Sequence, residues 1–272
     1  MNRDANKGYE WNIQKDMLPL MTLDTELSLM DIVAKEAGVD KSKIISHDLY
    51  LYNRDKAKIW GAEEEFLSAA RLDDQACAFS ALTALINSCG NNKCSNAINI
   101  HVVFDNEEVG SSSIQGACST LLKDTLERIT EGVGITKEDY HRAIADSFMF
   151  SADNAHALHP NYTDKCDPTN RPVLGKGVVI KFAGNQKYTT DAESAAFVWK
   201  LADKAQIKLQ KFHNNSNIAG GSTLGNLLVH SLPILCADVG IPQLAMHSAY
   251  ETCAISDAED MYKLGLELYK AE

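Results

Sequence analysis

The stretch that decides the fold lies near the middle of the chain. It reads Ile98-Asn99-Ile100-His101-Val102-Val103-Phe104, followed at once by Asp105-Asn106-Glu107-Glu108. The first part is rich in β-branched residues and predicts a strand that stops at Asp105. Apolar residues then recur at helical spacing over residues 110–129 and predict a helix. The segment is therefore expected to deliver several carboxylates to the carboxyl end of a strand.

The same alternation of strands and helices extends outward along the chain. We predict strands over residues 147–151, 177–182, 207–212 and 233–237, and helices over residues 72–85, 192–204, 222–231 and 257–268. Nearer the amino terminus, we predict a helix over residues 27–37 closed by Gly38, and a half-buried strand within residues 44–52. This order is typical of an α/β sandwich with a largely parallel or mixed sheet and helices on both faces.

Composition narrows the class of protein. Hydrophobic residues make up 45% and charged residues 23% of the 272 residues, which are ordinary values for a globular protein. No segment approaches the roughly 20 apolar residues of a membrane-spanning helix, so we expect no membrane association. A formal net charge of −11 would repel a phosphate backbone, so we expect no nucleic-acid partner. Seven cysteines without a CxxC pair, and no apolar signal sequence, favour a cytoplasmic location.

Four groups of polar residues are predicted where strands end, which is where ligands bind in open α/β sheets. They are Asp73-Asp74, the acidic run at residues 105–108, Asp153 with His156 and His159 behind it, and His247. Carboxylates and imidazole are ligands that zinc accepts, and several carboxylates can bridge a pair of metal ions. A further carboxylate that binds no metal can serve as a general base.

Each of these groups also has a structural interpretation. Pro160 directly follows His159 and disfavours a helix there, so for His156 and His159 this interpretation is a structural role or an indirect role beside the metal. Asp73-Asp74 is suited to cap the helix that follows. Glu107-Glu108 is suited to the start of a helix, where the helix dipole favours acidic residues. His247 alone is typical of a hydrogen-bonded core histidine. The coincidence of all four groups nevertheless favours a hydrolytic metal site.

A glycine-rich segment at residues 220–225 precedes a predicted helix and has the look of an anion-binding loop. It lacks the lysine of a phosphate-binding loop and the spacing of a dinucleotide-binding motif. We interpret it as a tight turn whose backbone amides face a carboxylate of a ligand.

Longer motifs around these groups resemble the signature blocks of the aspartyl aminopeptidase family. The blocks are DNEEVGS at residues 105–111, SADNAHALHPNY at residues 151–162 and DVGIPQLAMHS at residues 238–248, with supporting matches at residues 71–73 and 177–181. They occur in the family's order and cover essentially the whole chain. The resemblance implies a zinc-exopeptidase-like α/β sandwich, whose carboxyl-terminal part would occupy residues 61–272. Residues 1–60 would then be a remnant of the family's dimerisation domain.

The resemblance also implies a function. Members of the family are di-zinc metalloaminopeptidases that remove amino-terminal, preferably acidic, residues from peptides. By resemblance, Asp73 would bridge two zinc ions. Glu108 and His247 would complete one zinc site, and Asp153 would serve the other. Glu107 would be the general base that acts on a zinc-activated water.

Two further residues would contact the peptide substrate. Lys181 resembles the family's lysine near the acidic side chain of the substrate, and Tyr188 falls in a block that resembles the wall of the substrate pocket. The structural alternatives are a solvated lysine at a strand end and a buried core tyrosine. Because members of the family assemble as dimers and dodecamers, we expect a homo-oligomer.

One departure from the family affects the metal site. The family's catalytic domain begins with a half that carries a His-x-Asp motif, whose histidine shares a zinc ion with the residue matched by Asp153. No segment here matches that half, so one zinc site is expected to lack its histidine. His47-Asp48 falls in the dimerisation segment, and Tyr250 stands where an arginine is usual. Two functions therefore remain open: a metalloaminopeptidase, or a catalytically silent fragment or paralogue that only folds and oligomerises.

Overall fold

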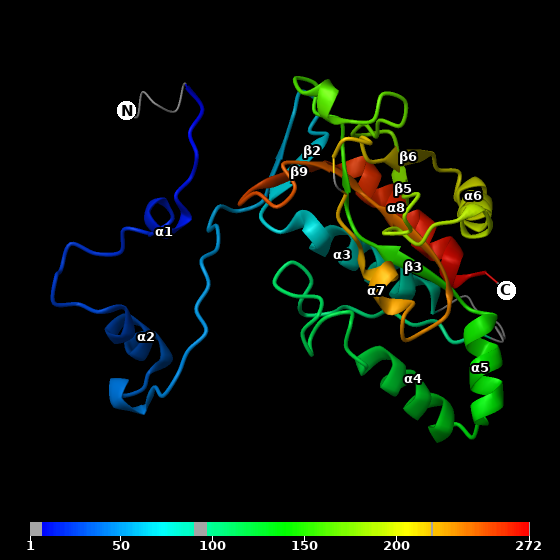
Figure 1. Ribbon diagram of the computed structural model, residues 1–272, viewed down its shortest axis with the longest axis horizontal. Helices are drawn as coiled ribbons and strands as arrows, with labels where there is room; N and C mark the ends of the chain where they lie inside the picture. Colours follow the sequence, from blue (N-terminus) through cyan, green and yellow to red (C-terminus); the bar gives the residue numbers. More distant parts are fainter. Residues whose placement is uncertain (1–6, 90–96, 219, 272) are drawn as a thin grey trace. The chain divides into compact units, whose positions relative to one another are not determined.

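The computed structural model describes residues 7–89, 97–218 and 220–271 (Figure 1). By its internal contacts the chain divides into two compact units, Met1–Leu51 and Tyr52–Glu272. The first unit contains α1 (Ile13–Asp16), α2 (Leu29–Ala37) and a 3-10 helix at Lys41–Lys43. None of the helices in the described part of the chain is long and apolar enough to span a membrane.

Helix α2 forms where the sequence predicts it. Ser28 and Asp31 form a capping box, in which each side chain accepts a hydrogen bond from the other residue's backbone N–H. Gly38 ends the helix in the left-handed conformation at φ 66°. The strand predicted within residues 44–52 is wrong, because these residues lie in no strand and residues 45–52 are exposed. Alternation of apolar and polar residues makes a strand only when a neighbouring strand pairs with it.

The second unit contains the remaining elements. Its strands are β1 (Lys58–Trp60), β2 (Phe66–Ala69), β3 (Phe148–Ala152), β4 (Ala155–His156), β5 (Val178–Phe182), β6 (Leu209–His213), β7 (Leu235–Gly240), β8 (Pro242–Leu244) and β9 (Glu251–Ala254). Its helices are α3 (Leu72–Ser88), α4 (Leu121–Gly132), α5 (Lys137–Ala145), α6 (Ala192–Ala205), α7 (Leu224–Leu228) and α8 (Ile255–Tyr269), with a 3-10 helix at Thr163–Lys165.

The strands form two sheets, in the orders β1-β2-β9-β8-β4 and β3-β7-β5-β6. In the second sheet β3 is parallel to β7 and β5 is parallel to β6, whereas β5 and β7 are antiparallel. The first sheet combines antiparallel pairs with the parallel pair of β4 and β8. The predicted mixed α/β architecture is therefore confirmed.

The two sheets join where the chain passes from β3 into β4 and, alongside it, from β7 into β8. The N–H of Asp153, between β3 and β4, donates to Val239 O at 3.0 Å, and the N–H of Ala155 donates to Ile241 O at 2.9 Å. The backbones approach so closely that a Cβ added to Gly240 would lie 1.8 Å from Asp153 O. Only glycine fits there, and this contact fixes the position of Asp153 at the bend.

Helices cover both faces of the β3-β7-β5-β6 sheet (Figure 1). Along β3, Phe148 and Phe150 face a core that includes Leu72 of α3 and residues of α6 and α8. Met149 faces the opposite way, toward a second core built by α4, α5 and α7. This alternation is the period of two that a strand imposes on its side chains.

Two predictions for the central stretch are wrong. Residues 98–104 form no strand, and Ile98 and Val103 are 60% and 62% exposed. A helix was predicted over residues 110–129. Residues 110–120 instead form turns, and the helix begins at Leu121. High β-propensity describes a residue's fit to a pleated surface, and among the described residues no strand pairs with residues 98–104 to provide that surface.

Candidate metal centre

The first acidic pair lies where α3 begins. Asp73 and Asp74 have non-helical backbone angles, with φ −87° and ψ 110° for Asp73 and φ −114° and ψ 26° for Asp74. Arg71 occupies the N-cap position, and no side chain caps the helix there. The Asp73 side chain contacts His247, which is distant in the sequence.

His247 joins Asp73 and Glu108 into one group. Its Nε2 atom lies 3.2 Å from Asp73 Oδ2 and 2.7 Å from Glu108 Oε1. One ligand atom from each of the three residues lies within 4.8 Å of the other two. His247 follows β8 in a turn and has a positive φ of 65°. The fold thus brings together three residues from three separate segments, in a set of donors that zinc accepts.

Asp73 also belongs to a second group, with Asp74 and Asp153. Their carboxylate oxygens again lie within 4.8 Å of one another. The Oδ1 atoms of Asp73 and Asp74 are buried and have no hydrogen-bond partner among the described residues. Buried polar atoms are normally paired, so two orphaned carboxylate oxygens fit a site for a cation. Asp73 is the residue shared by the two groups.

The ionisation of these acids shows how strongly they repel one another. Burial raises the pKa of Asp73 to about 8, with further contributions from Asp153 and Glu108. Burial and the charge of Asp153 also raise the pKa of Asp74 well above its usual value. Carboxyls this close cannot all ionise unless cations neutralise them. The electrostatics therefore agree with the ligand geometry.

Glu107 lies beside these groups and belongs to neither. It is half-buried and lines a cavity of about 1350 Å³ together with Asp73, Asp74, Glu108 and Asp153. Burial, with Glu108 and Asp153 nearby, raises the pKa of Glu107 to about 7. A carboxyl in this position can take up and release a proton near neutral pH.

Lys181 lies next to Asp153, Tyr188 lies next to Lys181, and both are buried. Lys181 is 3% exposed, and its Nζ atom lies 2.8 Å from Asp153 Oδ2 and 5.6 Å from the centre of the Tyr188 ring. Burial lowers the pKa of Lys181, but Asp153, Asp238 and Tyr188 together outweigh burial and raise the pKa overall. Tyr188 packs in a small core with Val179 and Phe212. The lysine is therefore charged and directed at the metal centre.

Glu251, which was not predicted from the sequence, also supports the centre. This carboxylate is 2% exposed. Its Oε2 accepts the backbone N–H of Asp73 at 2.8 Å, and its Oε1 accepts the backbone N–H of His247 at 2.7 Å. Only its position four residues after His247 hinted at a role, because an acid at the start of a strand has no distinctive sequence pattern.

Asn154 was also missed, although it follows the predicted ligand Asp153. Its Nδ2 donates to Leu72 O at 2.7 Å and to Gln243 Oε1 at 2.8 Å, and its Oδ1 accepts from Cys77 Sγ at 2.9 Å. The buried amide thus ties the start of α3 to the bend after β3. The Asn154 side chain therefore fixes the backbone segments that carry Asp73 and Asp153.

Three other acidic or histidine candidates lie outside both ligand groups. Asp105, His156 and His159 are absent from them, and His159 Nδ1 instead accepts the backbone N–H of Asn161 at 3.2 Å. Burial and the nearby charges of His247 and Lys181 lower the pKa of His156. Asp73-Asp74 and His247 thus contribute in full, whereas the acidic run at residues 105–108 and the group around Asp153 contribute only in part.

Two carboxylate-rich groups that share an aspartate, with a glutamate left free beside them, form the kind of donor arrangement that metal-dependent hydrolases use. The comparison with known proteins gives the particular family. The profile described as "Aminopeptidase I zinc metalloprotease (M18)" matches residues 1–269, and the chain belongs to this M18 family.

Curated relatives agree with this assignment. A "Probable M18 family aminopeptidase 2" from Clostridium novyi is 44% identical over 99% of this chain and 62% of its own length. The "Aspartyl aminopeptidase 1" of Schizosaccharomyces pombe is 36% identical over 95% of this chain and 59% of its own length. The chain therefore spans about 60% of the length of the relatives that it matches.

Solved structures show the same fold. The structure titled "Cryo-EM structure of the Ape4 and Nbr1 complex" superposes with a TM-score of 0.87 at 33% identity, over 99% of this chain and 55% of that chain. The S. cerevisiae mApe1 dodecamer superposes with a TM-score of 0.75 at 32% identity, over 89% of this chain and 54% of that chain. The α/β architecture is that of M18 aminopeptidases.

Proposed function

We propose that this chain carries the metal centre of a zinc aminopeptidase that removes amino-terminal residues from peptides. The observation that carries the proposal is the pair of ligand groups sharing Asp73, with Glu107 free beside them. Membership of a family described as zinc metalloproteases supports the choice of metal. The two orphaned carboxylate oxygens supply the structural reason for a cation at this place.

Two zinc positions follow from the two ligand groups. Glu108 and His247 would hold one zinc ion and Asp153 the other, with Asp73 contributing to both. Zinc held there would act as a Lewis acid toward the peptide carbonyl and toward water. In the described chain the second group contains only carboxylates, so its zinc is expected to be held more weakly.

Glu107 is the proposed general base. A carboxylate that binds no metal can take the proton of the attacking water and return it to the leaving amine. The position of Glu107 in the same cavity as the ligands, together with its raised pKa, supports this role. Such proton transfer typically contributes about 10²–10⁴-fold to the rate.

The proposed substrates are peptides with an acidic amino-terminal residue. Lys181 is a buried, charged amine beside Asp153, and it is suited to attract a carboxylate that enters the centre. Tyr188 packs against this amine and would form the adjoining wall of the substrate pocket. The name of the S. pombe relative, an aspartyl aminopeptidase, points to the same preference.

We also propose that the protein acts as a homo-oligomer in the cytoplasm. One structural neighbour is a dodecamer. Size-exclusion chromatography with light scattering would test this assembly, and a monomer at micromolar concentration would contradict it.

The test of the proposed function combines zinc binding with peptide hydrolysis. The zinc-loaded chain should release Asp or Glu faster than Leu from the amino terminus of matched peptides. Asp73→Asn and His247→Ala should each weaken zinc binding, whereas Glu138→Gln, on the exposed face of α5, should not. Zinc binding without hydrolysis would identify a catalytically silent relative. If neither variant weakens zinc binding, the proposed zinc site is wrong.

A further inference from the structure

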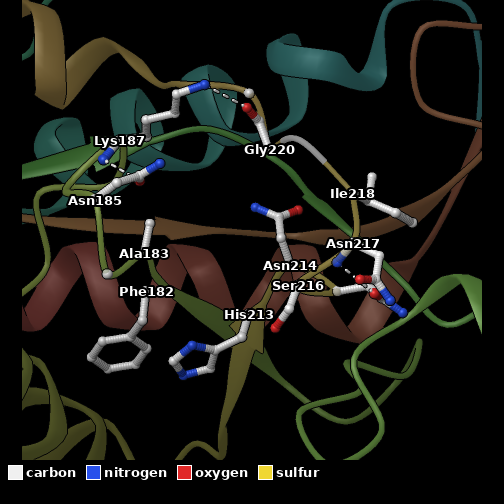
Figure 2. A pocket seen from close by; sticks show the side chains of 13 residues that line it. Phe182, Ala183, Asn185, Lys187, His213, Asn214, Ser216, Asn217, Ile218 and Gly220 are labelled. Carbon is white, nitrogen blue, oxygen red and sulfur yellow. Dashed lines mark hydrogen bonds between the residues drawn. The ribbon is translucent and has the colours of Figure 1, made fainter.

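A second cavity, of about 510 Å³, lies at the carboxyl ends of β5 and β6 (Figure 2). These strands are parallel, so their ends meet at one edge of the sheet, where α/β proteins bind ligands. The residues that line it include Phe182, Asn185 and Lys187 from the β5 side and His213, Asn214 and Asn217 from the β6 side. No lining residue belongs to either metal-ligand group.

The lining of this cavity is suited to a negatively charged ligand. It includes no Asp or Glu, although the chain has 37 of them. Lys187 runs along the upper edge of the cavity (Figure 2), and one of its three N–H donors binds Gly220 O at 2.9 Å. The Asn214 amide points into the space between Lys187 and Asn217 (Figure 2), and it makes no hydrogen bond with the described residues.

The walls of the cavity are held in place by a buried acid behind them. Asp238 of β7 is fully buried, and its Oδ2 accepts the N–H and the hydroxyl of Thr189, the latter at 2.7 Å. Its Oδ1 accepts the hydroxyl of Thr223. Thr189 lies two residues after Lys187, on one wall of the cavity, and Thr223 lies three residues after Gly220, on the other wall. One carboxylate thus fixes both walls, and a site whose walls are already fixed loses less entropy on binding.

We propose that this cavity binds the carboxylate of a small ligand. The Lys187 ammonium supplies the positive charge, and the Asn185 and Asn214 amides supply neutral donors. The rings of Phe182 and His213, whose centres lie 5.3 Å apart, stack on each other below these donors (Figure 2). The site requires no metal ion, and it is independent of the function proposed for the metal centre.

Two carboxylate sources share this chemistry: an acidic side chain and the carboxyl terminus of a peptide. Titration calorimetry on the metal-free protein separates them with three probes. N-acetylglutamate α-amide carries only a side-chain carboxylate, N-acetylglycine carries only a terminal carboxylate, and N-acetylglutamine amide carries neither. We expect one of the first two to bind and the third to show no binding.

Lys187→Gln should weaken binding of that carboxylate about tenfold or more, because a hydrogen bond to a charged group is lost. Lys211→Gln is the matched control, since Lys211 stacks on Trp199 and does not line the cavity. Circular dichroism would verify that both variants fold. If neither carboxylate binds, or if both variants bind like the wild type, the proposal is overturned. Because the readout uses no zinc and no peptidase activity, its failure leaves the metal centre untouched.

Discussion

The carboxylate of Glu251 accepts the backbone N–H of His247 at a distance of 2.7 Å. Its other oxygen accepts the backbone N–H of Asp73 at 2.8 Å. Two residues of one ligand group, 174 positions apart in the sequence, are therefore positioned by one buried side chain. Such outer contacts orient metal ligands and affect how tightly a metal binds.

Glu251→Gln should weaken zinc binding by about 10- to 100-fold. The amide has a single acceptor oxygen, so it can satisfy only one of the two backbone N–H groups. The measurement is a competition titration of zinc with a chelator of known affinity. Glu259→Gln, whose side chain pairs with Lys263 on α8, is the control. Equal zinc affinity in wild type and Glu251→Gln would show that the ligands need no such support.

Glu107→Gln and Glu108→Gln should affect different properties, peptide hydrolysis and zinc binding respectively, although the residues are adjacent. The first should abolish peptide hydrolysis and leave zinc binding nearly unchanged, because Glu107 lies outside both ligand groups. The second should weaken zinc binding, because Glu108 contacts His247. Zinc titration and peptide hydrolysis, measured on the same preparations, distinguish the two. Hydrolysis that survives Glu107→Gln would indicate a different base.

The chain should retain nearer one zinc ion than two after gentle dialysis. The group containing His247 combines an imidazole with carboxylates, whereas the group of Asp73, Asp74 and Asp153 offers carboxylates alone. Elemental analysis of the dialysed protein measures the ratio. A firm ratio of two would mean that another residue or subunit completes the second position.

Asp257 should make stability depend on pH. Burial raises its pKa to about 6, although the N–H groups of Gly175 and Gly177 partly oppose this by donating to its carboxylate. The folded state then holds this proton more tightly than the unfolded state. The free energy of unfolding therefore falls as pH rises from about 4 to about 6, by at most about 3 kcal/mol.

Urea unfolding of the metal-free protein at pH 4 and pH 7 would measure this effect. Other acids also titrate in this range, so the informative quantity is the difference between wild type and Asp257→Asn. Wild type should lose stability relative to Asp257→Asn as pH rises. A constant difference across the range would contradict the raised pKa.

Gly240→Ala should destabilise the fold by about 1–3 kcal/mol or more, because the new Cβ would collide with Asp153 O. Gly240→Ala should also lower zinc affinity, because the collision displaces Asp153. Gly132→Ala is the control: it lies in α4, and a Cβ there meets nothing within 4 Å. Thermal unfolding measures the first effect and chelator competition the second. A neutral Gly240→Ala would mean that the two strands separate at little cost.

Local sequence was sufficient where a segment carries its own stop signals or is buried on both sides. The capping box at Ser28 and the left-handed Gly38 define the two ends of α2 through local contacts. The buried strand β5 and the amphipathic helix α6 also form close to their predicted positions. In these segments the period of apolar residues and the end signals agree with the final environment.

The sequence by itself also determined which residue types gather at the centre, because Asp73, Glu108 and His247 lie in motifs that resemble a known family. Tertiary structure alone decided that Glu251 supports two of the ligands and that Asp74 joins the group of Asp73 and Asp153. It also decided that residues 98–104 remain outside the sheets. The physical reason is that side-chain chemistry and helix caps are local properties. Strand pairing and the meeting of distant carboxylates depend instead on which backbone lies alongside.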